Sequence, residues 1–175
     1  VAEHASNTLP WFDVAEETGA VVKYIELDEE GRMTLENVKK AVTENTKIIS
    51  LAIVTNVLGY EVPIKETTEY AHSKGIIVVA DGAQSVPHIV TDVERDDVDF
   101  LAFSGHKMCG PTGVGVLYGK YELLEETKPT RFGGGSNSRY NSCGLVTLKE
   151  PPYKFEAGTP HIEGVIGLGA AVKYL

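Results

Sequence analysis

The chain has 175 residues, of which 42% are hydrophobic and 23% charged, and its formal net charge is −9. This size and composition fit one globular domain that buries a single core without disulfide or metal staples. The acidic balance argues against a non-specific nucleic-acid surface or an anionic-membrane surface, because both need clustered Lys and Arg. We therefore expect a small-molecule substrate or a protein partner.

Cysteine usage points to a reducing compartment. Cys109 and Cys143 are too few for a disulfide framework, and neither stands at ligand spacing from another cysteine or histidine, so we expect a cytoplasmic protein without a metal site. No apolar run approaches the roughly 18 residues of a membrane helix, and no leader pattern is present, so we expect no membrane contact. The sequence starts without Met and stops inside a helix-forming run, which predicts a piece of a longer protein.

Short β-branched apolar runs alternate with amphipathic helical runs, which predicts an α/β fold with a mainly parallel sheet flanked by helices. The predicted strands are, in chain order, residues 21–25, 47–54, 76–80, 99–103 and 114–118. The predicted helices are one that Thr34 caps and that runs to about Val42, one between Pro63 and Gly75, and one from Glu163 onward. Residues 133–152 carry turn residues and little periodicity, so they are predicted to form an exposed hairpin arm.

Polar side chains follow the third and fourth predicted strands: Asp81, Gln84, Ser104, His106 and Lys107. Neighbouring parallel strands end at the same edge of a sheet, where open α/β sheets bind ligands, so we expect these side chains to converge on one pocket. Taken alone, Asp81 also fits a residue that only caps a turn, and Lys107 also fits an ordinary solvated lysine.

A lysine and a carboxylate at one sheet edge are the pair that pyridoxal 5'-phosphate (PLP) requires. The lysine forms a Schiff base with the cofactor, and the carboxylate keeps the pyridine nitrogen protonated so that the ring accepts electrons from the substrate. Hydroxyl, imidazole and backbone N–H groups can bind the phosphate. PLP is therefore the expected cofactor.

Several motifs resemble those of one enzyme family. Residues 104–107 followed by 110–113, with 81–84 upstream, resemble the cofactor site of the class V aminotransferase superfamily, which has PLP fold type I. Three further motifs resemble the SufS-type cysteine desulfurase and selenocysteine lyase branch: residues 3–7, 55–59 and 155–160. The resemblance covers nearly the whole chain. It implies that residues 1–175 are a partial large, PLP-binding domain, with an N-terminal segment and a small C-terminal domain outside this sequence.

The resemblance implies roles for four residues around the cofactor ring. Lys107 is the Schiff-base lysine, and Asp81 pairs with the pyridine nitrogen. Gln84 binds the phenolic oxygen, and His4 stacks on the ring as an acid–base group. From the residues alone, His4 also fits a capping or surface histidine near the first helix.

Four further residues are implied around the phosphate and the substrate. Ser104 and His106 contact the phosphate, although turn-forming polarity explains both residue types as well. Asn56 lies near the ring or the substrate carboxylate, or only forms a turn. Thr159 reaches the phosphate bound by the partner subunit, which requires a homodimer.

The activity implied is that of a PLP-dependent cysteine desulfurase, which converts L-cysteine to alanine and an enzyme persulfide for iron–sulfur cluster assembly and passes sulfur to an acceptor protein. In the family, the sulfur-accepting cysteine lies beyond Leu175. We expect Cys109 to be a small packed residue, and Cys143 to be exposed without a basic neighbour that would activate it.

Two alternatives to a desulfurase stay open. One is another class V enzyme, namely an aminotransferase, selenocysteine lyase, epimerase or kynureninase-like lyase, which would share Asp81 and Lys107. The other is a truncated, non-catalytic dimerisation or docking module. A nicotinamide-binding domain is disfavoured because the sequence lacks a Gly-x-Gly-x-x-Gly motif between a first strand and helix.

Overall fold

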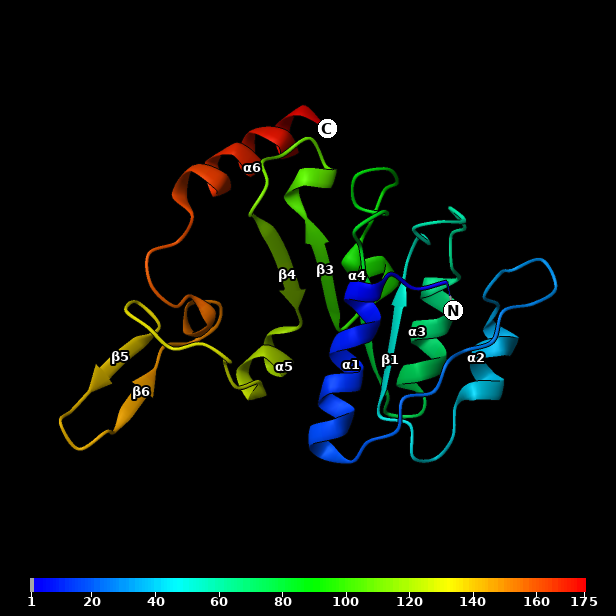
Figure 1. The fold of residues 1–175 in the computed structure, drawn as a ribbon, viewed down its shortest axis with the longest axis horizontal. Helices are drawn as coiled ribbons and strands as arrows, with labels where there is room; N and C mark the ends of the chain where they lie inside the picture. The colour runs from blue at the N-terminus through cyan, green and yellow to red at the C-terminus, as the bar shows by residue number, and fades with distance from the viewer. Residues whose placement is uncertain (1) are drawn as a thin grey trace.

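A four-stranded sheet forms the centre of the computed structural model, which describes residues 2–175 (Figure 1). The strand order is β1 (Ile48–Ala52), β2 (Ile77–Asp81), β3 (Phe100–Ser104) and β4 (Gly115–Gly119). The first three strands run parallel, and β4 pairs antiparallel with β3. The predicted α/β fold with a mainly parallel sheet is confirmed.

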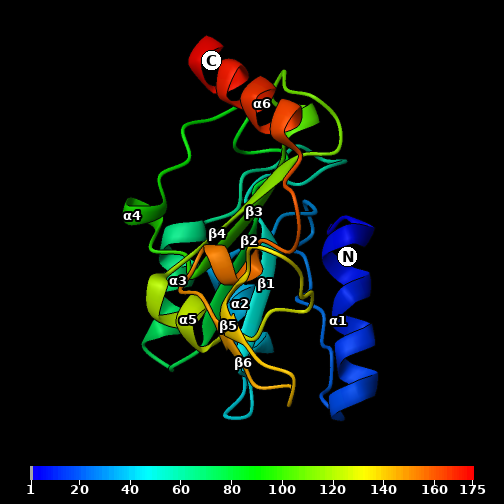
Figure 2. The ribbon, with the colours of Figure 1, turned by 90° about the vertical axis from the view of Figure 1, so that its left-hand side faces the viewer.

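Helices flank the sheet on both faces (Figure 2). Helix α1 (Ala5–Thr18) lies over one face, and α3 (Ile64–His72) and α4 (Val93–Asp96) lie over the other. The remaining helical segments are α2 (Leu35–Ala41), α5 (Tyr121–Glu126), α6 (Ile162–Tyr174) and the 3₁₀ turns η1 (Gly105–Lys107) and η2 (Tyr153–Phe155). None of the helices within residues 2–175 has the length and apolar character needed to span a bilayer.

Local signals set the ends of the predicted helices. At the start of α2, the Thr34 hydroxyl accepts a hydrogen bond from the Asn37 amide and the Asn37 side chain accepts one from the Thr34 amide, both at 3.2 Å. This reciprocal capping box satisfies two amides that the first helical turn leaves unpaired. After α3, Gly75 has a φ of +69°, a left-handed conformation that glycine adopts at little cost.

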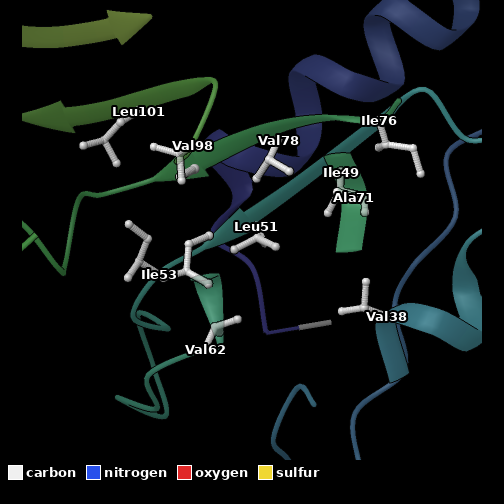
Figure 3. Close-up of a cluster of buried hydrophobic side chains, with 12 residues drawn as sticks. Val38, Ile49, Leu51, Ile53, Val62, Ala71, Ile76, Val78, Val98 and Leu101 are labelled. Atoms are coloured by element: carbon white, nitrogen blue, oxygen red, sulfur yellow. The ribbon is translucent and has the colours of Figure 1, made fainter. Parts of the chain in front are cut away.

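The hydrophobic core lies between the sheet and the α2–α3 side of the molecule (Figure 3). Leu51 of β1, Val78 of β2, Ala71 of α3 and Val38 of α2 are each at most 1% exposed. Burying one such valine or leucine contributes about 1.5–3 kcal/mol to folding. The core therefore fixes β1 and β2 side by side, with their ends in register.

The predicted strand at residues 21–25 is wrong. The segment runs extended and forms no strand pairing with any described residue. A strand needs a partner backbone about 4.8 Å away, and a cavity of about 610 Å³ lies between residues 20–27 and β1. The β-branched composition of the segment agrees with its extended backbone. A strand also needs a hydrogen-bonded partner, and local composition does not determine whether one lies alongside.

A two-stranded hairpin projects from the sheet beside α5 (Figure 1). Strands β5 (Asn137–Tyr140) and β6 (Val146–Leu148) pair antiparallel, within the range 133–152. At the base of this arm the buried Lys154 side chain donates a 2.7 Å hydrogen bond to the carbonyl of Glu125 at the end of α5. This bond ties the arm to the main domain, because a buried ammonium group needs an acceptor.

Candidate functional site

The carboxyl ends of the three parallel strands meet at one edge of the sheet. The register aligns Ala52 of β1, Asp81 of β2 and Ala102 of β3 in one row. Neighbouring strands lie about 4.8 Å apart, so the residues that follow this row share a small area. Asp81 ends β2 and Ser104 ends β3, and the structure brings them to the same edge.

The Asp81 carboxylate makes one hydrogen bond within its own turn and keeps its other oxygen unpaired among the described residues. Its Oδ1 accepts a 2.8 Å hydrogen bond from the Ala83 amide, while Oδ2 accepts none from the described residues. The next residue, Gly82, is closely packed: a Cβ there would lie 2.7 Å from Cδ1 of Leu101, which would have to shift. Asp81 therefore caps a turn and also presents an oxygen that can bind a protonated nitrogen.

Two of the expected site residues contact each other directly. The side-chain amide of Gln84 donates a 2.6 Å hydrogen bond to Oδ1 of Asn56. This bond joins the loops that follow β1 and β2, at the edge that also carries Asp81. It leaves the amide oxygen of Gln84 as an acceptor and the amide nitrogen of Asn56 as a donor.

Lys107 lies in a tight turn built on glycines. The amides of Met108 and Gly110 both donate to the carbonyl of Gly105, at 3.0 and 2.9 Å. A Cβ on Gly105 would lie 2.9 Å from Cγ1 of Val114, so the turn excludes a side chain there. Lys107 is half-buried, and its amine has no hydrogen-bond or ion-pair partner among residues 2–175. A half-buried, unpaired amine at this edge can serve as a covalent attachment point.

Helix α6 supports this turn, a contact that the sequence analysis missed. Cδ1 of Leu168 lies 3.3 Å from the ideal Cβ positions of both Gly105 and Gly110. Pro111 packs against Gly167, where an added Cβ would lie 2.9 Å from its Cγ. The sequence does carry one signal for this contact, which is glycine within the apolar helical pattern of α6. Glycine at such a position indicates close packing against a neighbouring segment rather than catalysis.

The predicted packing of Cys109 is wrong. Cys109 is exposed and has a φ of +60°, whereas the preceding Met108 is only 5% exposed. The left-handed backbone at Cys109 reverses the chain, so Met108 fills the interior position and the thiol faces outward. Cys143, at the turn of the hairpin arm, is also exposed.

His4 caps helix α1. Its Nδ1 accepts a 3.2 Å hydrogen bond from the Ser6 amide, so the capping role that the residue also fitted is observed. In the neutral ring this bond selects the tautomer with its proton on Nε2, and that atom remains available. His106 and Thr159 are exposed, and their side chains make no hydrogen bond to the described residues.

Residues 1–175 match the family model described as Aminotransferase class-V. The chain belongs to the class-V aminotransferase family.

Class-V relatives and solved structures extend the comparison. The "Probable cysteine desulfurase" of Halalkalibacterium halodurans is 51% identical over 99% of this chain and 42% of that protein. The crystal structure of the cysteine desulfurase CsdA from Escherichia coli matches with a TM-score of 0.96 and 42% identity, over 99% of this chain and 43% of that one. The cysteine desulfurase structure from Thermococcus onnurineus matches with a TM-score of 0.92 and 40% identity, over 98% and 43% of the two chains. The chain thus spans about two fifths of the length of these relatives.

Proposed function

We propose that residues 1–175 form the large-domain part of a PLP-dependent cysteine desulfurase. One observation carries the proposal: Asp81 ends β2, Lys107 follows the adjacent parallel strand β3, and each keeps a reactive atom unpaired within the described residues. Structures named as cysteine desulfurases share this fold at 40–42% identity, which supports the desulfurase reaction over other class V reactions.

The donor set suits PLP. Lys107 would hold the cofactor through its amine, and Oδ2 of Asp81 would accept the pyridinium N–H. The Gln84 amide, fixed by Asn56, would bind the phenolic oxygen. Ser104, in the last position of β3, would donate its hydroxyl to the phosphate. When bound, PLP supplies an electron sink for the substrate's α-carbon.

Further groups would bind the phosphate and move protons. His106, next to Lys107, would contact the phosphate, and Thr159 would reach the phosphate of a partner subunit in a homodimer. His4 would cover the ring and exchange a proton through Nε2, because its Nδ1 is engaged by the Ser6 amide. The displaced amine of Lys107 would carry the proton at the α-carbon of the substrate.

The substrate is L-cysteine, the products are alanine and a persulfide, and the sulfur passes to an acceptor protein for iron–sulfur cluster assembly. The sulfur-accepting thiolate is proposed to lie in a part of the longer protein outside this chain, and the lack of a basic side chain bonded to Cys109 or Cys143 among the described residues supports this. Both thiols are free, which supports a reducing, cytoplasmic setting.

The test compares full-length protein with its Lys107→Ala variant after addition of PLP. We expect wild type to develop a visible absorption band, to carry a borohydride-reduced adduct on Lys107, and to release alanine from cysteine. The Lys107→Ala variant loses all three, whereas Lys74→Ala, at an exposed lysine after α3, loses none. A wild-type band in Lys107→Ala would overturn the site, and a band without alanine release would assign another class V reaction.

A further inference from the structure

The turn that carries His4 is tied to β1 by a chain of side-chain hydrogen bonds. The Glu3 carboxylate accepts the Ala52 amide at 3.0 Å through Oε1 and the Asn7 side-chain amide at 2.8 Å through Oε2. Oδ1 of Asn7 in turn accepts the Ser50 hydroxyl at 2.7 Å. Glu3, Asn7 and Ser50 are all half-buried. The residues on either side of His4 are therefore fastened to the sheet, whereas His4 itself is not.

Ala52, whose amide binds Glu3, lies in the row of the sheet that forms the candidate site. Ala52 is paired in register with Asp81 on β2. The Glu3 carboxylate therefore holds the start of α1 at the row of the sheet that carries the Asp81 carboxylate. The α1 cap then fixes the imidazole, because the Ser6 amide donates to its Nδ1. Two independent restraints, one on the backbone and one on the ring, define where Nε2 of His4 lies.

We infer that Glu3 and Asn7 are positioning residues for His4, which act by holding its backbone against the end of β1. The inference rests on the proposed function, since it assigns the orientation of a group that works on bound PLP. Neither residue touches the reacting atoms in this assignment. Their removal should therefore change the placement of the imidazole over the cofactor rather than remove a reacting group.

Three substitutions in this network differ in how many of its hydrogen bonds they keep. In Glu3→Gln the amide oxygen still accepts from Ala52, the amide nitrogen donates to a flipped Asn7 side chain, and Asn7 then donates to Ser50, whose hydroxyl accepts as well as donates. Every bond is retained. Glu3→Leu removes two acceptors at once. Asn7→Asp places two carboxylates at hydrogen-bond distance, which is tolerated only when they share a proton.

The experiment uses full-length, PLP-loaded protein and follows kcat against pH, the PLP dissociation constant and the visible circular dichroism of the bound cofactor. We expect Glu3→Leu to lower kcat by about 10- to 100-fold and to change the dichroism, as a small misplacement of a catalytic group does. Glu3→Gln retains kcat within about threefold because its hydrogen bonds are kept. Glu16→Leu, at an exposed position of α1, is the control and matches wild type.

Asn7→Asp keeps the inference testable even if Glu3→Leu folds poorly. With wild type measured at each pH as the reference, its kcat and dichroism approach those of wild type at acidic pH and depart from them as the shared proton is lost. Unchanged dichroism and kcat in both Glu3→Leu and Asn7→Asp would overturn the positioning role alone. Wild-type protein that forms no visible band with PLP overturns the proposed function, and the positioning role with it.

Discussion

A cluster of four side chains, His72, Asp97, Asp99 and Lys120, lies at the end of the sheet opposite the candidate site. The ring nitrogens of His72 lie 3.0 Å from Asp97 and 2.9 Å from Asp99, and the Lys120 amine lies 2.6 Å and 3.0 Å from the same two carboxylates. Asp99, which precedes β3, also accepts the Val78 amide of β2 at 2.7 Å. The cluster thus joins the end of α3, the start of β3 and the end of β4.

The acid dependence of stability follows from this cluster. Burial raises the pKa of Asp99, but the Val78 amide, His72 and Lys120 outweigh it and hold the pKa below its ordinary 3.8. The hydrogen bond from Lys120 likewise lowers the pKa of Asp97. Because both carboxyls bind protons more weakly in the folded state, their contribution is complete above the unfolded pKa and is lost as pH falls below about 4.

Lys120→Met should lower the free energy of unfolding by about 1–2 kcal/mol at pH 7. The buried Asp99 carboxylate then loses one of the partners that offset the cost of its burial. The loss of stability on acidification should also become smaller, since the carboxyl pKa values return toward their ordinary range. Urea unfolding at pH 7 and pH 3 measures both effects. Lys128→Met, at an exposed lysine without an ion pair among the described residues, is the control. Equal stability of the two variants at pH 7 would contradict the assignment.

For single residues, the sequence predicted only those positions that depend on a local pattern. Asp81 and Ser104 were placed correctly at strand ends because each directly follows an apolar run. The bond from the Ala52 amide to Glu3 spans 49 positions in the chain, and no local pattern signals it. Cys109 was misplaced because its left-handed backbone depends on the glycine-rich turn around it.

Two glycines of α6 offer a matched test of helix packing. An added Cβ on Gly167 would lie 2.9 Å from the Pro111 ring, whereas one on Gly169 would meet no atom within 4 Å. Gly169→Ala should therefore stabilise the protein by about 0.5–1 kcal/mol, the usual gain from alanine in a helix. Gly167→Ala should fail to show this gain because Pro111 must move. Thermal unfolding of both variants measures the difference, and an equal gain in both would show that α6 does not pack on the turn as described.

The same helix matters for the site, so Gly167→Ala should also weaken PLP binding in the full-length protein. Pro111 follows the Lys107 turn directly, and a shift there moves the lysine. Gly169→Ala should leave the PLP dissociation constant unchanged. This pair separates an effect on the cofactor from a general effect on helix stability.

Helices and strands differ in how far sequence predicted them. Thr34 and Gly75 mark helix ends through hydrogen bonds and backbone angles that involve only a few neighbouring residues, and both predictions were correct. The extended segment 21–25 has the composition of a strand but no described partner. Strand formation depends on which backbone lies alongside, and that is decided by the rest of the fold.

For the whole molecule, the proposed homodimer requires that Thr159 be accessible to a partner subunit. Thr159 lies in an exposed loop before α6, and its hydroxyl makes no hydrogen bond to the described residues of its own chain. Apolar side chains remain exposed on nearby elements, among them Leu117 of β4 at 61% and Ile166 of α6 at 69%. The segments that cover these side chains can belong to the rest of the longer protein or to a partner subunit, so the residues do not by themselves identify a dimer surface. The homodimer in which Thr159 serves the partner's phosphate is a proposal, and the exposure of Thr159 is the condition that it requires.

Subunit complementation tests this arrangement. In full-length protein, Lys107→Ala removes the attachment point of its own site, and Thr159→Val weakens PLP binding in the partner's site by about 10- to 100-fold through loss of a charge-assisted hydrogen bond. If the two residues of one site come from different subunits, a mixed dimer of the variants contains one intact site and one doubly altered site. Random mixing, followed by assay at limiting PLP, should then restore about a quarter of the wild-type activity, since half of the dimers are mixed and each has one intact site of two. If Thr159 serves its own subunit, every site in the mixture carries a defect, and mixing restores nothing beyond the average of the separate variants.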